Sequence, residues 1–167
     1  MGHIIDQFAV DRNHEIVLKI DAHNAGELTN ENLKKAAIAL DFSTPYTVVH
    51  HIKKCFEANV PIVVGTTGWY DHLPQIKNEC EHHGHSLLYA SNFSVGVNLF
   101  FAVNKILAKM MNPYPQYDVQ IEEIHHTHKL DSPSGTAITM AEGVIEQMNR
   151  KKEWVNELVG TRPEISH

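Results

Sequence analysis

Short apolar runs alternate with amphipathic stretches along the first half of the chain. Pro61–Val64 is apolar throughout, a pattern typical of a strand covered on both faces of a parallel sheet. Three other segments are predicted to be strands: His14–Ile20, Ile38–Phe42 and Ser86–Tyr89. The segments around them have helical apolar spacing: 4–9, 30–37, 45–58 and 71–83. The alternation of strands and helices predicts an α/β doubly wound fold.

The second half of the chain is predicted to contain two long helices. Val97–Met111 is strongly apolar, and six of its side chains are expected to face a core: Leu99, Phe100, Val103, Ile106, Leu107 and Met110. Residues 112–115, with two prolines, end this helix. Asp118–Ile124 is predicted to be a strand, and apolar residues recur at helical spacing after Thr136.

Each predicted strand of the first half leads into a polar or glycine-containing loop. In doubly wound sheets, ligands bind outside the carboxyl ends of the strands. We therefore expect four segments to share one rim: Asp21, Asp41–Thr44, Gly65–Thr67 and Ala90–Phe93. Taken singly, Asp21 could be a solvated acid and 65–68 only a turn, but their common placement favours a ligand site.

The stretch 122–137 has the densest chemistry in the chain. Three imidazoles and an ammonium lie within five residues: His125, His126, His128 and Lys129. A Ser-Pro-Ser-Gly-Thr turn then leads into the predicted helix. The first N–H groups of a helix lack intrahelical partners, and Gly135 lets the backbone approach a ligand closely. This arrangement suits an anionic small molecule such as a carboxylate.

Two interpretations of the cluster give it no role in proton transfer. The histidines could be solvated surface residues, because short motifs often occur by chance. Alternatively, His126 and His128 would share one face of a strand and could bind a metal together with Glu122 or Glu123. The neighbouring Lys129 opposes the metal interpretation, and nothing nearby completes a zinc signature.

Two further interpretations use the cluster as a reactive or anion-binding site. His125 or Lys129 could donate a proton, which needs a pKa near the working pH. The Ser-Gly-Thr turn could bind phosphate, although the full Gly-x-x-x-x-Gly-Lys-Ser/Thr pattern is absent.

Composition narrows the classes of partner. The formal charge of −6 without a basic tract argues against nucleic acid. The longest apolar run, Leu99–Val103, is far below the roughly 18–20 residues of a membrane span. No signal segment is evident, so we expect a soluble, cytoplasmic protein. Cys55 and Cys80 have no CxxC spacing and are expected to be reduced.

Three motifs resemble those of one enzyme family. The run 122–137 closely resembles the signature of bacterial 4-hydroxy-tetrahydrodipicolinate (dihydrodipicolinate) reductases, in which His-His-x-x-Lys precedes Asp-x-Pro-Ser-Gly-Thr-Ala. Val64–Gly68 and Ser91–Asn98 resemble the family's other two motifs, in the same order. The resemblance implies a Rossmann-like parallel-sheet domain at 1–94, followed by an incomplete α+β substrate and oligomerisation domain at 95–167.

The resemblance also implies an activity and its residues. A cyclic unsaturated dicarboxylate would be reduced by NADH or NADPH in the diaminopimelate branch of lysine synthesis, without a metal. His125 and Lys129 would form the proton-donating pair, with His125 favoured as general acid. The substrate would be held by His126, Lys129, Ser134, Gly135 and Thr136. The cofactor would contact Met1, Asp21, Phe42, Gly65, Thr66, Thr67, Ala90, Ser91, Asn92 and Phe93.

The family pattern extends beyond both ends of this sequence. Met1-Gly2 resembles the end of the family's glycine-rich turn, so the resemblance implies a missing first strand. We therefore expect an isolated 167-residue chain neither to bind the cofactor tightly nor to turn over. Asp21 disfavours a 2′-phosphate, which favours NADH. The family's tetramer would form through the missing C-terminal part.

Three alternatives remain, the first of them within the same class of enzymes. Another nicotinamide-dependent reductase of similar build could act on an aldehyde or semialdehyde, although neither cysteine lies in a strand-end loop. The chain could also be a cofactor-binding or oligomerisation module without activity. A metal hydrolase is the third alternative, which metal analysis would decide.

Overall fold

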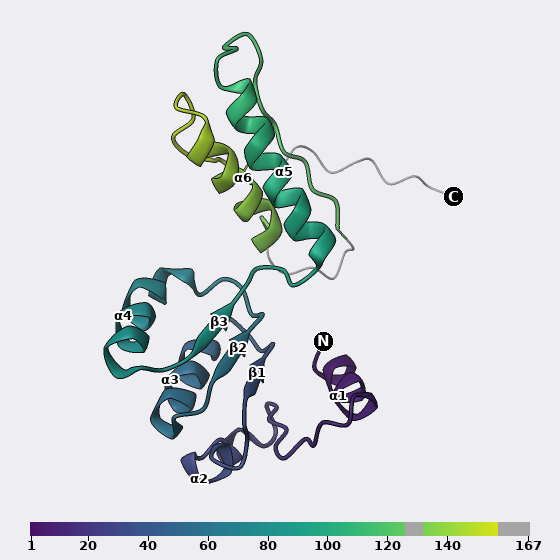
Figure 1. Cartoon of the computed structure of the whole chain (residues 1–167), viewed down its shortest axis with the longest axis vertical. Helices are drawn as coiled ribbons and strands as arrows, with labels where there is room; N and C mark the ends of the chain where they lie inside the picture. The colour runs from purple at the N-terminus through teal and green to yellow at the C-terminus, as the bar shows by residue number, and fades with distance from the viewer. Residues whose placement is uncertain (126–131, 157–167) are drawn as a thin grey trace. The chain divides into compact units, whose positions relative to one another are not determined.

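The computed structural model describes residues 1–125 and 132–156. The chain divides into two compact units, the first spanning Met1–Ser91 and the second beginning at Asn92 (Figure 1). Among the helices of the described residues, none has the length and apolar character needed to cross a bilayer.

The first unit contains a three-stranded parallel sheet in the order β1-β2-β3. The strands are β1 (Ala39–Asp41), β2 (Ile62–Val64) and β3 (Leu87–Tyr89). Asp41 pairs with Val64, and Val64 with Tyr89, so the carboxyl ends of the strands are level. Ile62 and Val64 of the central strand are buried, which confirms the predicted covered strand.

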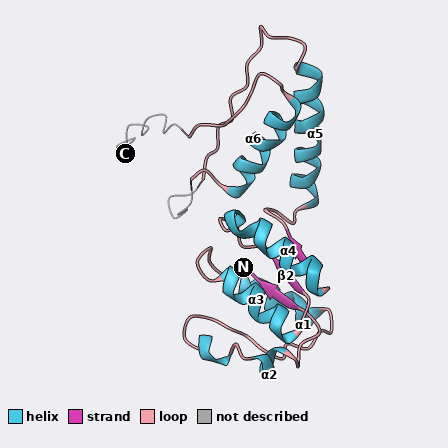
Figure 2. Cartoon of the chain, turned by 90° about the vertical axis from the view of Figure 1, so that its left-hand side faces the viewer, coloured by secondary structure: helices cyan, strands magenta, loops and turns pink. Residues whose placement is uncertain are grey.

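Helices connect these strands, as the periodicity predicts (Figure 2). The main ones are α3 (Val48–Ala58) and α4 (Leu73–His83), the latter preceded by the 3-10 turn η2 (Tyr70–His72). The apolar face of α3 is buried in the core with the sheet residues, and each such side chain contributes about 1.5–3 kcal/mol. Asn59 and Gly84 end the two helices in the left-handed conformation. The predicted α/β class is confirmed.

The segment before the sheet differs from the prediction. It contains α1 (Gly2–Asp11), the 3-10 turn η1 (Ala25–Glu27) and α2 (Asn30–Leu33), which is shorter than the predicted helix 30–37 and is capped by Thr29. The predicted strand 14–20 is wrong, because the described sheet has three strands and this segment is not one of them. Its side chains alternate in burial, as in a strand, and Leu18 packs on the core. A strand also needs backbone hydrogen bonds to a neighbouring strand, which the side-chain pattern does not predict.

The second unit is built on α5 (Val95–Met111) and α6 (Gly135–Gln147), which pack against each other. Ala108, Val144 and Met148 form its buried core. Asn104 Nδ2 donates a hydrogen bond to the carbonyl of Met140 at 2.9 Å. The contact is close at Gly143, since a Cβ there would lie 3.2 Å from Lys105 Cγ.

Two predictions for the second unit are wrong. The six α5 side chains expected to face a core are 54–65% exposed, because α6 packs on the opposite face of α5, which carries Asn104 and Ala108. The predicted strand 118–124 has no strand assignment, and Figure 2 shows helices and loops but no strand in the described part of this unit. Arg150 instead holds the start of this segment by donating to the carbonyls of Asn112 and Tyr117.

Candidate functional site

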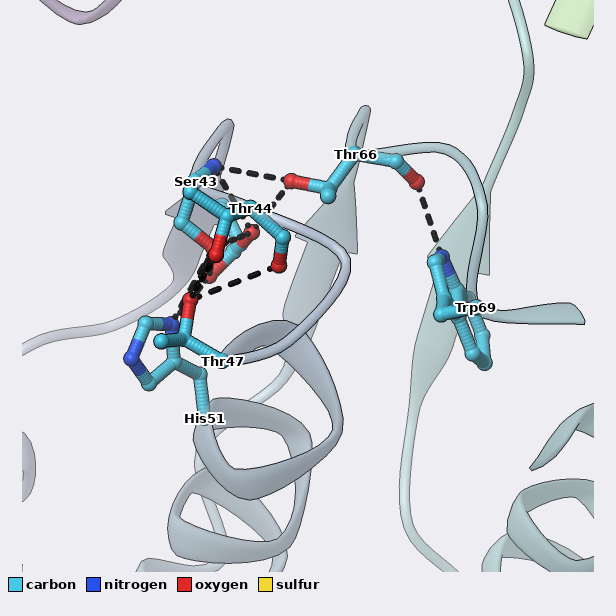
Figure 3. Close-up of polar contacts among 7 residues, drawn as sticks. Ser43, Thr44, Thr47, His51, Thr66 and Trp69 are labelled. Atoms are coloured by element: carbon cyan, nitrogen blue, oxygen red, sulfur yellow. Dashed lines mark hydrogen bonds and ion pairs between the residues drawn. The ribbon is translucent and has the colours of Figure 1, made fainter. Parts of the chain in front are cut away.

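Asp41, the last residue of β1, organises the rim of the sheet in the first unit. Its side chain is only 8% exposed. Its Oδ1 accepts hydrogen bonds from Thr66 Oγ1 at 2.7 Å and from the Ser43 N–H at 3.1 Å (Figure 3). Its Oδ2 lies 2.6 Å from His51 Nδ1. These partners compensate the carboxylate for the water it loses on burial.

The charge state of Asp41 follows from these partners. Burial raises the pKa of the carboxyl, but hydrogen bonds from His51, Thr66 and Ser43 outweigh burial and leave the pKa below its ordinary value. Asp41 is therefore ionised at neutral pH. Since a carboxylate can only accept, His51 Nδ1 carries a hydrogen and donates a hydrogen bond to Asp41 Oδ2.

This Ser-His-Asp set is not a nucleophilic triad. In a triad the acid bonds one ring nitrogen of the histidine and the serine bonds the other. Here Ser43 Oγ donates directly to Asp41 Oδ1 at 2.9 Å, and it lies 3.4 Å from the same Nδ1 that faces Asp41. The arrangement is therefore a hydrogen-bond network that fixes backbone loops.

The loop after β2 is fixed from two sides. Thr66 Oγ1 donates to Asp41, and the Thr66 carbonyl accepts a hydrogen bond from Trp69 Nε1 at 2.8 Å (Figure 3). A Cβ at Gly65 would overlap the ring of Phe42, so the loop after β1 can approach only because residue 65 is glycine. Gly68 has a φ of +79°, which a side chain would strain.

The third rim segment adjoins β2. The Ala90 N–H donates to the carbonyl of Val64 at 3.2 Å. The structure thus brings together six of the predicted cofactor residues at one edge of the sheet: Phe42, Gly65, Thr66, Thr67, Ala90 and Ser91. This is the rim expected from the sequence, apart from the residues that follow.

The other four predicted cofactor residues are Met1, Asp21, Asn92 and Phe93. Asn92 and Phe93 belong to the second unit, where Asn92 Oδ1 accepts the N–H of Ser94 at 2.8 Å. Met1 precedes α1. Asp21 follows no strand, and its carboxylate accepts the N–H of His23 within a local turn.

In the second unit, Glu123 links His125 to the start of α6. Glu123 Oε1 accepts the N–H of Ser134 at 2.8 Å, and Glu123 Oε2 lies 2.9 Å from His125 Nε2. Burial raises the pKa of Glu123, but hydrogen bonds from Ser134 and His125 outweigh it and leave the pKa below its ordinary value. An ionised Glu123 therefore accepts from both groups at neutral pH.

Two backbone N–H groups at the start of α6 have no acceptor among the described residues. Ser134 Oγ caps the helix by accepting the N–H of Ala137 at 3.0 Å. The N–H groups of Gly135 and Thr136 donate to no other residue within 1–125 or 132–156. Free donors at the positive end of a helix dipole suit a carboxylate.

Three residues of the predicted cluster, His126, His128 and Lys129, lie outside the described residues. Among the described residues, no three histidine, cysteine, aspartate or glutamate side chains are grouped to hold a metal ion.

Comparison with known proteins now identifies the family. The family model described as "Dihydrodipicolinate reductase, N-terminus" matches residues 1–93, and the one described as "Dihydrodipicolinate reductase, C-terminus" matches residues 96–162. The chain belongs to the dihydrodipicolinate reductase family.

Individual members of the family are clearly similar. The chain is 44% identical over 156 residues to 4-hydroxy-tetrahydrodipicolinate reductase of Christiangramia forsetii, covering 92% of this chain and 64% of the relative. It is 38% identical over 170 residues to the reductase of Acinetobacter baylyi, covering 90% of this chain and 61% of the relative. The chain therefore spans less than two thirds of the length of these dihydrodipicolinate reductases.

A solved structure of the same family has a related fold. It is the dipicolinate-bound dihydrodipicolinate reductase from Paenisporosarcina sp. TG-14, which is 30% identical with a TM-score of 0.53. The match covers 87% of this chain and 55% of that one.

Sequence reasoning missed two groups of the site. His51 follows Asp41 by ten residues on a helix whose buried face is apolar, and nothing in that pattern indicates a polar partner for Asp41. Glu123 was considered only as a metal ligand, whereas it holds His125 and Ser134. Its position just before the motif shared with dihydrodipicolinate reductases is the one available signal.

Proposed function

We propose that this chain serves in the reduction of 4-hydroxy-tetrahydrodipicolinate to tetrahydrodipicolinate, in the diaminopimelate branch of lysine synthesis. The proposal is supported by family membership, by the names of the relatives and by two donors at the start of α6, beside the Glu123–His125 pair, that have no acceptor among the described residues. Those donors are the observation on which it chiefly rests. We also propose a cytoplasmic location and a homotetramer, both by family resemblance.

The α6 start would bind one carboxylate of the substrate. The N–H groups of Gly135 and Thr136 point out of the helix N-terminus, which contributes roughly 0.3–2 kcal/mol towards a single negative charge. A dianion needs further positive charge. By resemblance His126 and Lys129 would supply it, and both lie outside the described residues.

His125 would deliver the proton. Its Nε2 is engaged by Glu123 at 2.9 Å, so the opposite nitrogen, Nδ1, is the one that can face a substrate. Lys129 would assist. A positioned general acid typically contributes about 10²–10⁴-fold to the rate.

The rim of the first unit fits a nicotinamide cofactor, which supplies the hydride when bound. Backbone loops follow the carboxyl ends of parallel strands there, and the glycine at position 65 lets Phe42 of the loop after β1 pack against the loop after β2. Phe42, the loop 65–67 and the loop from Ala90 would make the contacts. We propose NADH over NADPH by resemblance to the family, whose motif would place Asp21 at the adenosine ribose, where an acid disfavours a 2′-phosphate.

The semialdehyde alternative needs a reactive cysteine, and Cys55 does not fit that role. Cys55 is buried in α3, and burial, together with the charge of Asp41, raises the pKa of its thiol to about 11. Such a thiol is almost wholly protonated at neutral pH and is a poor nucleophile.

A chimera tests the proposed activity. In the reductase of Christiangramia forsetii, the 156 aligned residues would be replaced by those of this chain, and oxidation of NADH or NADPH would be followed with 4-hydroxy-tetrahydrodipicolinate. We expect turnover, lowered about 10²–10⁴-fold by His125→Ala. A folded chimera that binds NADH but is inactive, or one in which His125→Ala has no effect, would contradict the proposal.

A further inference from the structure

Two loops at the sheet rim are joined through one buried carboxylate. We propose that Asp41 and His51 form a positioning pair that holds loop 42–44 and loop 65–68 in the arrangement that receives the cofactor. The proposal rests on the cofactor site of the proposed function, and it assigns a role to two residues that need not touch the ligand.

The side chain of Thr66 connects the two loops. Thr66 Oγ1 donates to Asp41 Oδ1 at 2.7 Å and accepts the N–H of Ser43 at 2.8 Å. One hydroxyl therefore ties loop 65–68 both to the end of β1 and to the backbone of loop 42–44 (Figure 3). Its orientation depends on Asp41 being present and ionised, since only then must the Thr66 O–H point at the carboxylate.

Helix α3 holds the second oxygen of the Asp41 carboxylate. His51 lies in this helix, and its Nδ1–H donates to Asp41 Oδ2, leaving Oδ1 to the two loops. One turn earlier, Thr47 Oγ1 donates to Ser43 Oγ at 3.2 Å. The first turns of α3 thus hold both the carboxylate and the loop, and α3 is itself anchored by its buried apolar face.

Stability alone does not explain the buried network. Replacing a buried charged network by well-packed apolar side chains of similar volume is often neutral for stability or even stabilising. The core beneath the rim is already filled by apolar residues, among them Val48, Ile52 and Val64. The polar network instead fixes the conformation of the two loops, because each hydrogen bond requires a particular distance and angle between its donor and its acceptor.

Three variants of the full chain separate positioning from general stability. His51→Phe keeps a ring of similar size and removes the donor. His51→Asn restores a donor, because the Asn amide nitrogen lies as many bonds from Cα as Nδ1 does. His50→Phe is the matched control, since the exposed His50 neighbours His51 on α3 but has no bond to Asp41.

Two readouts apply to each variant. Amide hydrogen exchange of Ser43 reports the loop connection without any ligand, and exchange of Ile62 reports the sheet. Titration with NADH, followed through the amide signals of Thr66 and Thr67, gives a dissociation constant even where binding is weak.

We expect His51→Phe to speed Ser43 exchange and to raise the NADH dissociation constant, each by about tenfold, the size expected for a lost hydrogen bond to a charged group. Ile62 exchange should stay unchanged, His51→Asn should restore both values, and His50→Phe should match the wild type. Equal NADH binding by His51→Phe and wild type would overturn the proposal, as would uniform loosening of loop and sheet.

The failure of the proposed function is distinct. If neither the wild-type chain nor the chimera showed an NADH-dependent shift, the cofactor site would be refuted. The Ser43 and Ile62 exchange rates would still decide whether Asp41 and His51 hold the two loops.

Discussion

Each of the two units contains a carboxylate that bonds a serine N–H and a histidine, but the two carboxylates differ in burial. In the first, Asp41 accepts the N–H of Ser43 and pairs with His51; in the second, Glu123 accepts the N–H of Ser134 and pairs with His125. The side chain of Asp41 is 8% exposed, whereas that of Glu123 is 26% exposed.

This difference in burial separates two tasks. The buried carboxylate has donors on both oxygens and joins elements of the fold, so its loss should mainly affect stability and loop geometry. The more exposed Glu123 engages one nitrogen of His125, and the other nitrogen has no partner within the described part of the chain, so the loss of Glu123 should mainly affect chemistry. Removing each carboxylate in turn should therefore have different effects on stability.

The largest expected effect is that of Asp41→Ala. We expect it to lower the free energy of unfolding of the first unit by about 3–5 kcal/mol, because His51, Thr66 and Ser43 would lose their common acceptor. Urea unfolding followed by the fluorescence of the buried Trp69, in a Trp154→Phe background, measures it.

Glu123→Ala is the comparison for Asp41→Ala. We expect it to cost about 1 kcal/mol or less in the second unit, read from amide exchange of Val144. Glu122→Ala, at an exposed neighbouring position, is the control and should cost nothing measurable. Equal losses from Asp41→Ala and Glu123→Ala would contradict the contrast between the two carboxylates.

The pH dependence of stability should follow Asp41. Because its pKa is lowered in the folded state, its stabilising contribution is complete above the ordinary aspartate pKa of about 3.9 and is lost as the pH falls through the lower folded value. Urea midpoints of the first unit should therefore fall below about pH 4, and less steeply in Asp41→Asn. An identical pH profile in the variant would show that Asp41 does not set it.

A smaller effect is expected at the start of α6. Ser134→Ala removes the side-chain cap of Ala137 and should cost about 1 kcal/mol, while the bond from the Ser134 N–H to Glu123 remains. Ser94→Ala, which removes the longer 3.5 Å cap of α5 at Val97, should cost less. Amide exchange in α6 and in α5 measures the two losses of stability. A larger loss from Ser94→Ala than from Ser134→Ala would be evidence against a role for cap geometry.

The smallest effect concerns Cys55. Burial and the nearby charge of Asp41 raise the pKa of its thiol to about 11, so iodoacetamide at about pH 8 should leave it unmodified while the chain is folded. Cys80, which is less buried, should react faster. Peptide mass spectrometry after timed quenching distinguishes the two, and equal rates would mean that the first unit opens readily.

Much of the sheet could be predicted because burial alone determines its pattern. β2 is apolar at consecutive positions since both its faces are covered, and Gly84 marks the end of α4 through its left-handed conformation. The same reasoning failed for 14–20 and for α5. Alternation describes where side chains point, and an apolar stripe describes what a helix face could bury; neither specifies the partner that pairs with the strand or covers the helix.

The site could be predicted only in part, for a related reason. Gly135 and Thr136 lie at a helix start that local sequence defines, so their N–H groups could be anticipated. His51 could not, because its bond to Asp41 joins residues ten apart and depends on how α3 packs against the sheet. Tertiary contacts of this kind leave no local pattern.

Titration of the 167-residue chain with dipicolinate tests the central claim most directly. The amide signals of Gly135 and Thr136 and the ring signals of His125 should shift in a saturable manner, while those of Gly65 and Thr66 stay in place. Saturable shifts at the sheet rim with none at the start of α6, or no shift at either, would contradict the assignment of the carboxylate site.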